Sequence, residues 1–483
     1  MMKKISVVIS LFFAYLFASI TVIANGQSFI QAGNDKDYNE DYTSSVSQPD
    51  VLRLKGSALE MGMRYGSELK EDIRKNLKLF WQKAKSSGLS RDYLMYRGHL
   101  YEIMMQEVHP EALVELDAVS FAAGIDYQEL LAFNAMQETV FNDGCTNLLA
   151  HGTATKSAQV FFHKNRDVSG DPVQVVIERL SGPFHRYVAI TSAGSSGVAM
   201  GINEYGVSTG NTNLQTWDTG SGLGNLDINR IILERSADAL SAIDVIQGLH
   251  RRGGSNFHVT DAENALFIES THSDMKVGQV TDSARANTNH YVLPDMQNYE
   301  SGGTTSSHHR YIRANTLLQQ NLGQITHETM IAISRDRDGS YPISRTITVS
   351  AATFDNDRIL MYYQMGRPSV TTAVHLYDLG ELVHETSLLE PEEDHAMGLE
   401  LLRNYPNPFN NGTTLSYVLP WEGDVTLRIY DITGRLIDVL LEKHQAPGRY
   451  DIRFSAPDLS SGVYIYQLEV NGNKLSRTMV YNR

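Results

Sequence analysis

The feature that most constrains this chain is its single cysteine, Cys145, among 483 residues. One thiol cannot form a disulfide within the chain, and it cannot supply a cysteine-rich zinc site. The fold must therefore be held by an apolar core, and 42 % hydrophobic with 20 % charged residues is the composition of an ordinary globular protein. The lone thiol is an inert buried side chain, half of an intermolecular disulfide, or a reactive nucleophile.

Length and charge narrow the classes of protein further. At roughly 150 residues per domain, the chain has room for about three domains. Its 41 basic and 56 acidic side chains give a net charge of −15. Proteins that neutralise nucleic-acid phosphates carry clustered positive charge, so we expect no nucleic-acid partner.

Residues 1–26 have the three parts of a secretory signal peptide. Lys3 and Lys4 form the positive start, an almost wholly apolar run extends from residue 5 to residue 23, and the small residues Ala24 and Gly26 follow. A membrane anchor is the alternative, because the run is close to the length that spans a bilayer. No second apolar run of that length follows in the sequence, so we expect no stable membrane span after signal removal. The polar residues 27–50 are predicted to form a flexible leader.

Residues 404–483 have the alternating pattern of a small all-β sandwich. Turn signals separate the segments at Thr433-Gly434, Pro447-Gly448, Ser461-Gly462 and Asn471-Gly472. Residues 404–410, 429–434 and 459–464 resemble the type A C-terminal sorting domain of the type IX secretion system. This resemblance implies export across both membranes, contact with the type IX machinery, and a destination on the cell surface or outside the cell. A carbohydrate-binding or adhesive β-module is the alternative.

Residues 51–380 form a large central domain, followed by an acidic linker over residues 381–403. The domain begins with helices, including one over residues 109–123 that Gly124 ends. Short strands dominate after residue 144, with two helices between residues 228 and 249, the second predicted to be capped by Ser236. This order indicates a layered α+β fold. The sequence contains no glycine-rich phosphate loop or helical two-histidine metal motif, so we expect neither a cofactor nor a metal.

The residues around Cys145 favour a reactive thiol. Gly144 leaves the chain free to take unusual backbone angles just before the cysteine, and the polar Thr146 follows it. If the chain is cut before Cys145, the new α-amine, with an intrinsic pKa of about 7.7–8.0, can accept the thiol proton near neutral pH. This is the logic of N-terminal nucleophile (Ntn) hydrolases. Polar residues also follow predicted strands, at residues 164–167 after a strand over 159–163 and at residues 211–213.

The order and spacing of these motifs resemble the acyl-coenzyme A:6-aminopenicillanate acyltransferase-like family of cysteine Ntn enzymes. N-acylethanolamine acid amidase and choloylglycine hydrolase are more distant relatives. The likeness extends over most of residues 56–379, and its pieces are Glu60-Met61-Gly62, Leu131-Ala132-Phe133-Asn134, Asp143-Gly144-Cys145-Thr146, Asn165-Arg166-Asp167, Thr288-Asn289-His290 and Ser344-Arg345. The resemblance implies a four-layer αββα fold and self-cleavage between Gly144 and Cys145.

The same resemblance implies roles for six side chains. Cys145 would be the nucleophile and, through its α-amine, the base, and Asp167 would be the carboxylate that binds this amine. Asn213 would donate to the oxyanion, and Asn289 would lie near the amine or the tetrahedral intermediate. Arg345 matches a family arginine, and Lys164 stands where the amidase branch has arginine. Arg166 is an alternative source of that guanidinium contact. Structural alternatives stay open for the others: a turn or strand end for the asparagines, and an ion pair for the aspartate and for Arg345.

Together these features predict a secreted, self-processing hydrolase that cleaves linear amide C–N bonds through a thioester at Cys145. Water resolves the thioester in a hydrolase, and an amine does so in an acyltransferase. The expected substrate is a small N-acyl amide or a peptide-like molecule. Two alternatives remain: bile-salt hydrolysis of the choloylglycine type, and a non-catalytic surface protein that keeps an Ntn-like scaffold.

Overall fold

The computed structural model describes residues 51–141, 144–180, 184–302, 304–371, 373–380, 399–402, 404, 407, 409–410, 412–419, 421–432, 434–455 and 459–482. The predicted signal peptide, the leader, most of the linker and Asp143 of the cleavage motif lie outside these residues. Within the described ranges, no helix has both the length and the apolar character that crossing a bilayer requires.

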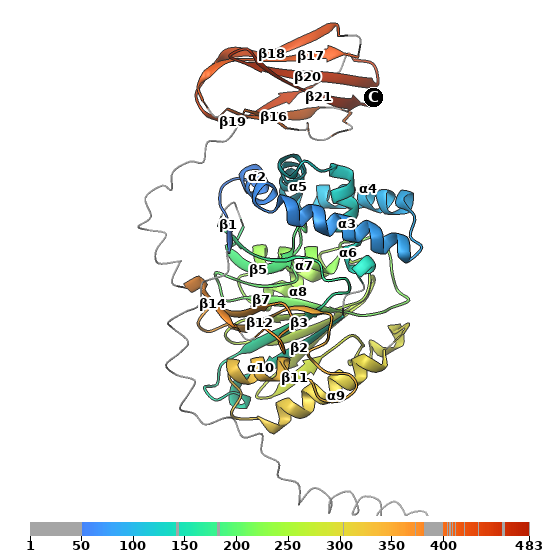
Figure 1. The fold of residues 1–483 in the computed structure, drawn as a ribbon, viewed down its shortest axis with the longest axis vertical. Coiled ribbons are helices and arrows are strands. Elements are labelled where there is room, and N and C mark those ends of the chain that lie inside the picture. The colour runs from blue at the N-terminus through green and yellow to red at the C-terminus, as the bar shows by residue number, and fades with distance from the viewer. Residues whose placement is uncertain are drawn as a thin grey trace, which may run out of the picture. The chain divides into compact units, whose positions relative to one another are not determined.

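Helices at the start of the central domain form its first layer (Figure 1). They are α2 (Ala58–Glu68), α3 (Lys70–Ser86), α4 (Arg91–Val108), α5 (Pro110–Ala123) and α6 (Tyr127–Phe141). Ser57 and Glu60 form a capping box that starts α2. Gly124 ends α5 as predicted, in a left-handed conformation with φ of 62°. α2 packs tightly on α5, because a Cβ at Gly62 would lie 2.4 Å from the Glu115 carbonyl oxygen.

An eight-stranded sheet forms the second layer, in the order β1-β4-β5-β6-β7-β8-β9-β10. Its strands are β1 (Leu52–Leu54), β4 (Gln174–Arg179), β5 (Tyr187–Ser192), β6 (Met200–Asn203), β7 (Ser208–Asn213), β8 (Ser255–Thr260), β9 (Ala265–Ser270) and β10 (Met275–Val280). Helices α7 (Asn225–Arg235) and α8 (Ser241–Gln247) contribute to the same apolar core as α2–α6. The outer face of this sheet is thus covered by helices.

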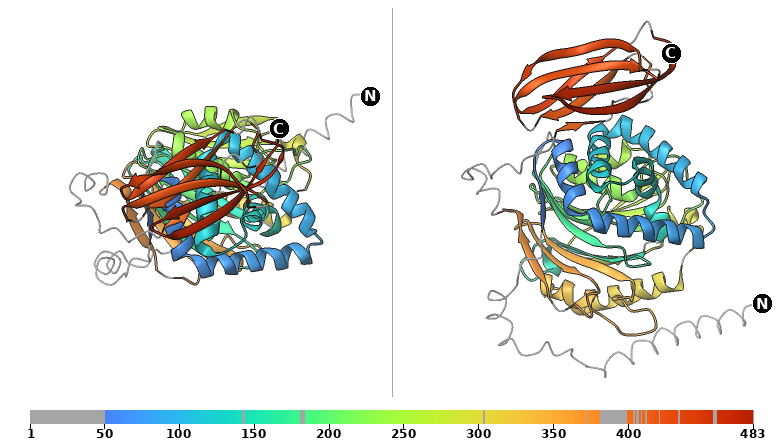
Figure 2. Two further views of the ribbon diagram at one scale, coloured as in Figure 1. Left: turned by 90° about the horizontal axis from the view of Figure 1, so that it is seen from above. Right: turned by 45° about the horizontal axis from the view of Figure 1, so that its top comes forward.

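A six-stranded sheet forms the third layer, in the order β11-β2-β3-β12-β13-β14. Its strands are β11 (Ala284–Asn287), β2 (Gly144–Ala150), β3 (Phe161–Asp167), β12 (Thr348–Asp355), β13 (Leu360–Met365) and β14 (His375–Asp378). Helices α9 (Thr305–Gln320) and α10 (His327–Ser334) form the fourth layer on its outer face (Figure 2). The predicted four-layer αββα arrangement is therefore confirmed.

Alternation along β3 explains how the six-stranded sheet packs on both faces. Phe162 belongs to the apolar cluster between the two sheets, together with Val188 and Met200. Its neighbour Phe161 belongs to a different cluster, which includes Leu317 of α9. Successive residues of β3 therefore face the space between the sheets and the outer helices in turn.

Two local predictions were wrong. The strand expected over residues 159–163 extends to Asp167, because β2 and β12 pair with β3 on both sides and satisfy its backbone that far. The polar residues 164–167 thus lie inside the sheet rather than after a strand. Ser236 does not cap a helix start: it ends α7 with an extended backbone, and α8 begins only after Leu240.

The C-terminal residues form a separate all-β domain, as predicted. One sheet contains β15 (Glu400–Leu401), β16 (Thr413–Leu419) and β19 (Gly448–Phe454). The other contains β18 (Leu436–Gln445), β17 (Gly423–Asp431), β20 (Gly462–Val470) and β21 (Asn473–Tyr481). Side chains from both sheets, among them Tyr417, Leu427 and Tyr466, share one buried core. The alternating pattern of these segments reflects the two faces of each strand.

Candidate active site

Cys145 lies at the start of β2, which runs between the edge strand β11 and β3 in the six-stranded sheet. It is 2 % exposed. Across the antiparallel ladder, Gly144 faces Asp167 and Cys145 faces Arg166. Because residues two apart share a face of a strand, Cys145 lies on the same face as Leu149, which packs between the two sheets.

The backbone nitrogen of Cys145 has a side-chain acceptor. It donates to Asn289 Oδ1 at 3.1 Å, and Asn289 Nδ2 donates to the carbonyl oxygen of Asn213 at 3.0 Å. Asn289 follows the end of β11, which pairs with β2, so the sheet itself brings the asparagine to the cysteine. The side-chain amide of Asn289 therefore links the backbone of Cys145 to the backbone of Asn213, and both asparagines were predicted from the sequence.

Asp167 is fully buried at the end of β3 and accepts two hydrogen bonds. Thr348 Oγ1 donates at 2.6 Å, and Arg345 Nη1 donates at 3.2 Å. Burial raises the pKa of the Asp167 carboxyl, while the positive charges of Arg310 and Arg345 oppose that rise. The predicted aspartate and arginine thus form an ion pair beside the strand residue Gly144.

Gly144 has a different reason to be glycine from the one expected. It is not among the described glycines with positive φ, so a left-handed backbone is not what requires glycine here. Space is limiting instead: a Cβ at Gly144 would lie 2.9 Å from Arg345 Nη1 and 3.6 Å from both Asn289 Oδ1 and Asp167 Cβ. A side chain here would collide with the ion pair.

Asn213, at the end of β7, has its side-chain oxygen held from two directions. Asn211 Nδ2 donates to Asn213 Oδ1 at 2.9 Å, and Asn225 Nδ2 donates to the same oxygen at 2.8 Å. The Oδ1 and Nδ2 atoms of an amide point in different directions, so this arrangement turns the Nδ2 donor of Asn213 away from both neighbours.

Lys164 lies farther along β3 and is 1 % exposed. Its Nζ donates to the Ala199 carbonyl oxygen at 2.9 Å and to Asn211 Oδ1 at 3.4 Å. It therefore reaches the asparagines of β7, on the face between the two sheets, rather than the Asp167 ion pair. Arg166, the alternative to Lys164, donates to Gln174 Oε1 at 2.6 Å.

Sequence analysis missed Arg310 of α9, which is 1 % exposed. Its Nη1 donates to the carbonyl oxygen of Cys145 at 2.6 Å and to Thr146 Oγ1 at 2.8 Å. Its Nη2 donates to Asn289 Oδ1 at 2.8 Å. Ser307, one turn earlier on α9, accepts from the backbone nitrogen of Asn289 at 2.8 Å. We call the group formed by Cys145, Asp167, Asn289, Arg310 and Arg345 the cysteine cluster.

A cavity of about 660 Å³ is lined by the residues that directly follow Asn289 and Ser307 in the sequence, and by others nearby. Its lining residues are His290, Tyr291, Val292, Gln297, Glu300, Ser301, Gly302, His308 and Tyr311. The His290 and His308 rings stack at 4.1 Å between centroids. Burial, His308 and Arg310 lower the pKa of His290 to about 4. No group of three or more potential metal ligands occurs among the residues that the structure describes.

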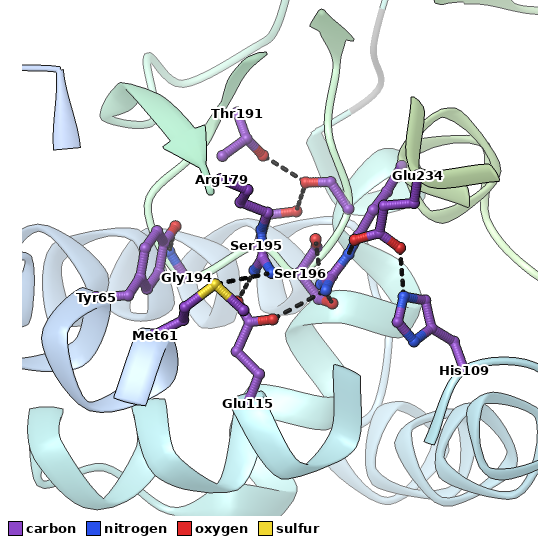
Figure 3. A network of polar contacts seen from close by, with 12 residues as sticks. Met61, Tyr65, His109, Glu115, Arg179, Thr191, Gly194, Ser195, Ser196 and Glu234 are labelled. Atoms are coloured by element: carbon purple, nitrogen blue, oxygen red, sulfur yellow. Dashed lines mark hydrogen bonds and ion pairs between the residues drawn. The ribbon is translucent and has the colours of Figure 1, made fainter. Parts of the chain in front are cut away.

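A second group of buried charges lies between α5, α7 and the outer face of the eight-stranded sheet (Figure 3). Its members, which we call the ionic cluster, are His109, Glu115, Arg179, Arg230 and Glu234. Glu115 contacts both arginines, and Arg230 also contacts Glu234 at 2.8 Å. His109 contacts the remaining oxygen of Glu234.

Residues 153–369 match the model of the family described as acyl-coenzyme A:6-aminopenicillanic acid acyl-transferase. The matched segment begins downstream of Cys145 and contains Lys164, Asp167, Asn213, Asn289 and Arg345. The predicted family resemblance is confirmed for this segment. It supports an enzyme of the amide-hydrolysing or acyl-transferring kind.

Residues 403–482 match the model of the secretion system C-terminal sorting domain. The C-terminal β-domain is therefore a sorting domain of type IX secretion. It directs the protein to the cell surface or the extracellular space. The predicted localisation is confirmed by this match.

Two solved structures are similar to part of this chain. A mutant conjugated bile acid hydrolase from Clostridium perfringens has 12 % sequence identity and a TM-score of 0.39, over 49 % of this chain and 93 % of that one. An N-acylethanolamine-hydrolyzing acid amidase ortholog from Caenorhabditis elegans has 16 % identity and a TM-score of 0.35, over 44 % of this chain and 93 % of that one.

Proposed function

We propose that the protein is a self-processing Ntn hydrolase, in which cleavage between Gly144 and Cys145 creates the cysteine that attacks amide bonds. The observation that carries this proposal is the set of contacts around one backbone nitrogen. Cys145 N donates to Asn289 Oδ1 at 3.1 Å, at the place where Asp167 meets an arginine. A cysteine that merely fills a core has no use for a buried carboxylate and a buried guanidinium beside its backbone.

Self-cleavage requires a shift of the Gly144 acyl group from nitrogen to sulfur. The Cys145 sulfur attacks the Gly144 carbonyl carbon, the C–N bond breaks, and the nitrogen takes up the thiol proton to become an α-amine. Water then hydrolyses the thioester, which releases the Gly144 carboxylate and restores the thiol. Because a Cβ at residue 144 would lie 2.9 Å from Arg345 Nη1, glycine keeps the attacked carbonyl beside an undisturbed ion pair.

In the processed enzyme, the α-amine of Cys145 acts as the base. It accepts the thiol proton, and the thiolate attacks the carbonyl carbon of the substrate amide. The Asn213 Nδ2 group, which its neighbours turn away from themselves, donates to the oxyanion. The ammonium group, stabilised by Asp167, returns the proton to the leaving amine. Water or an acceptor amine then resolves the acyl thioester.

The substrate class that fits this chemistry is a small N-acyl amide or a peptide-like molecule. The cavity of about 660 Å³ that His290 lines is large enough for a group of drug-like size. We propose that one part of the substrate occupies this cavity. Export by the type IX route means that the substrate is met at the cell surface or outside the cell.

The decisive experiment is N-terminal sequencing and intact-mass measurement of the purified, secreted protein. We expect two fragments, one ending at Gly144 and one beginning at Cys145, and rapid alkylation of the new terminal thiol by iodoacetamide. Cys145→Ala should yield one uncut chain without amidase activity. Cys145→Ser should cut slowly, because an alcohol is a poorer nucleophile than a thiol.

The pair of variants separates folding from chemistry. Both substitutions change one buried atom or remove it, so circular dichroism should stay that of the wild type. A wild-type chain that stays intact yet hydrolyses amides contradicts the proposed mechanism. An intact chain whose thiol resists iodoacetamide, with no turnover of N-acyl amides, points to the non-catalytic surface protein instead.

A further inference from the structure

Arg310 is the one member of the cysteine cluster that reaches it from α9, the outer helical layer. We propose that Arg310 is a positioning residue that locks the side-chain amide of Asn289 and so holds the α-amine of Cys145 in place as the base. This inference rests on the proposed function, because it concerns the same amine. It assigns a role to a residue that lies outside every motif quoted from the sequence.

The lock follows from the hydrogen-bond chemistry of the three groups. A guanidinium has only donors, so the atom of Asn289 that meets Arg310 Nη2 at 2.8 Å must be the acceptor, Oδ1. The same oxygen accepts from Cys145 N at 3.1 Å, while Nδ2 donates to the Asn213 carbonyl oxygen at 3.0 Å. A flipped amide would set an NH2 group against the guanidinium and break all three contacts.

The orientation of Asn289 decides how the amine of the cut chain points. A neutral α-amine has two N–H donors and one lone pair. With one N–H directed to Asn289 Oδ1, the position of the lone pair becomes restricted, and the lone pair is what must take the thiol proton. Without Arg310, only the hydrogen bond from Asn289 Nδ2 to the Asn213 carbonyl oxygen would still orient the amide from the side away from the amine, so the flipped form, which offers the amine a donor, would become more populated.

Arg310 also holds the residue that cleavage sets free. Chain termini fray unless other contacts hold them. After scission, Cys145 keeps only its peptide bond to Thr146. Arg310 Nη1 binds the Cys145 carbonyl oxygen at 2.6 Å and Thr146 Oγ1 at 2.8 Å, so a single side chain spans both sides of that bond. Cysteine and asparagine are thus clamped by one guanidinium.

The charge of Arg310 has a separate consequence for pH dependence. The charged groups that face the amine are Asp167 from β3, Arg345 from the segment before β12, Arg310 from α9 and the thiol itself, with Arg166 opposite in the ladder. A positive charge disfavours the ammonium form. Removing Arg310 should therefore keep the amine protonated to higher pH, and the acid limb of kcat/KM should move to higher pH.

The test compares Arg310→Met and Arg310→Lys with a matched control, Arg313→Met. Arg313 lies one turn along α9, is partly exposed, and pairs with Asp336 and Asp338. For Arg310→Met we expect slower self-cleavage and a kcat lower by about 10- to 100-fold, the equivalent of one hydrogen bond to a charged group. KM should stay within about twofold, because Arg310 is buried and donates to groups of the protein itself. Arg313→Met should behave as the wild type.

Arg310→Lys separates charge from geometry and serves if the methionine variant does not fold. Lysine restores the positive charge, so the acid limb should return toward that of the wild type. It cannot reproduce the fork of donors, so kcat should stay low. A wild-type-like kcat and pH profile in Arg310→Met, or a loss confined to KM, overturns the inference while leaving the proposed function intact. A wild-type chain that is neither cut nor active overturns both.

Discussion

The cysteine cluster and the ionic cluster contain the same kinds of buried charged side chains but use them differently. In the ionic cluster, two glutamates face two arginines, and His109 joins one of the glutamates. Burial lowers the pKa of His109, and Arg230 helps to keep the pKa of Glu234 low against its burial. The two carboxylates and the two guanidinium groups compensate one another's charge.

In the cysteine cluster, the donors converge on one residue instead. Asp167 faces Arg345 directly and feels Arg310, so positive charge exceeds negative charge locally. The guanidinium of Arg310 donates to the Cys145 carbonyl oxygen, to the hydroxyl groups of Thr146 and Ser306, and to the Asn289 amide oxygen. Buried ion pairs alone therefore do not mark an active site. Their convergence on the backbone of Cys145 is what supports the proposed active site.

The largest effect that tests this contrast is expected at Arg230, in the ionic cluster. Arg230→Met removes one of the two buried positive charges that face Glu115 and Glu234, so one net negative charge is left buried. This should lower the free energy of unfolding by about 3–5 kcal/mol. Urea unfolding of the purified protein measures the loss. The exposed Arg235 on the same helix is the control, and Arg235→Met should cost less than about 1 kcal/mol.

If the two clusters act separately, Arg230→Met should change neither self-cleavage nor turnover. Self-cleavage per folded molecule and kcat at a temperature well below unfolding should match those of the wild type. A drop in kcat of tenfold or more in a fully folded sample would show that the ionic cluster acts on the site, and the division between the two clusters would fail.

Asn213 should show the opposite behaviour, with a large effect on rate and a small one on stability. Asn213→Ala removes the proposed oxyanion donor, so kcat should fall by about 100- to 1,000-fold. Asn225→Ala keeps that donor but removes one of the two contacts that orient it, and we expect a loss of about tenfold or less. Steady-state kinetics on one N-acyl amide distinguishes the two. Equal losses in both variants would argue against a direct role for Asn213.

Local signals predicted a layered α+β fold, whereas the four-layer αββα arrangement was predicted by the resemblance to the acyltransferase-like family. Gly124 ends α5 as expected, and alternating apolar residues form the C-terminal sheets. The sequence also predicted Asp167, Asn213, Asn289 and Arg345, which the structure brings together near Cys145 through strand pairing.

Arg310 could not be predicted in the same way, since its role depends on the register of a distant helix against the sheet. The only sequence signal is a polar pair, Ser307 and Arg310, on the face of α9 that Ala314 and Leu317 bury. The adjacent histidines at 308 and 309 draw attention first, yet their Nδ1 atoms bond to carbonyl oxygens one turn earlier, those of Thr304 and Thr305, rather than to Cys145. Tertiary packing, which local patterns do not encode, decides which of these residues matters.

A smaller effect is expected from the pH dependence of stability that His163 of β3 causes. Like His109 in the ionic cluster, His163 is a buried histidine whose pKa is lowered. Burial lowers the pKa of His163 to about 4, against a hydrogen bond to Asn165 that opposes the fall. In the unfolded chain His163 is protonated below about pH 6.5, whereas in the folded protein it is protonated only below about pH 4. The free energy of unfolding therefore falls as the pH drops through this window. Between pH 7 and pH 5 the loss should be about 2 kcal/mol.

The measurement is urea unfolding at both pH values for the wild type and for His163→Gln. Glutamine can keep the contacts to Thr353 and Asn165 without titrating, so the variant should lose about 2 kcal/mol less than the wild type on acidification. An identical pH dependence in both proteins would mean that other groups carry it.

The smallest effect should come from Lys164→Arg, at the position where the amidase branch has arginine. Lys164 contributes a buried positive charge near Asn211, and arginine preserves that charge. Space is short, because a Cβ at Gly210 would lie 3.0 Å from Lys164 Cδ, so the bulkier guanidinium must displace its neighbours slightly. We expect kcat/KM to change by less than about tenfold, equivalent to about 1.4 kcal/mol, whereas the uncharged Lys164→Met should lose more. If the two variants lose the same activity, the site depends on the shape of lysine and not on its charge, and Lys164 belongs with the packing of the two sheets rather than with the cysteine cluster.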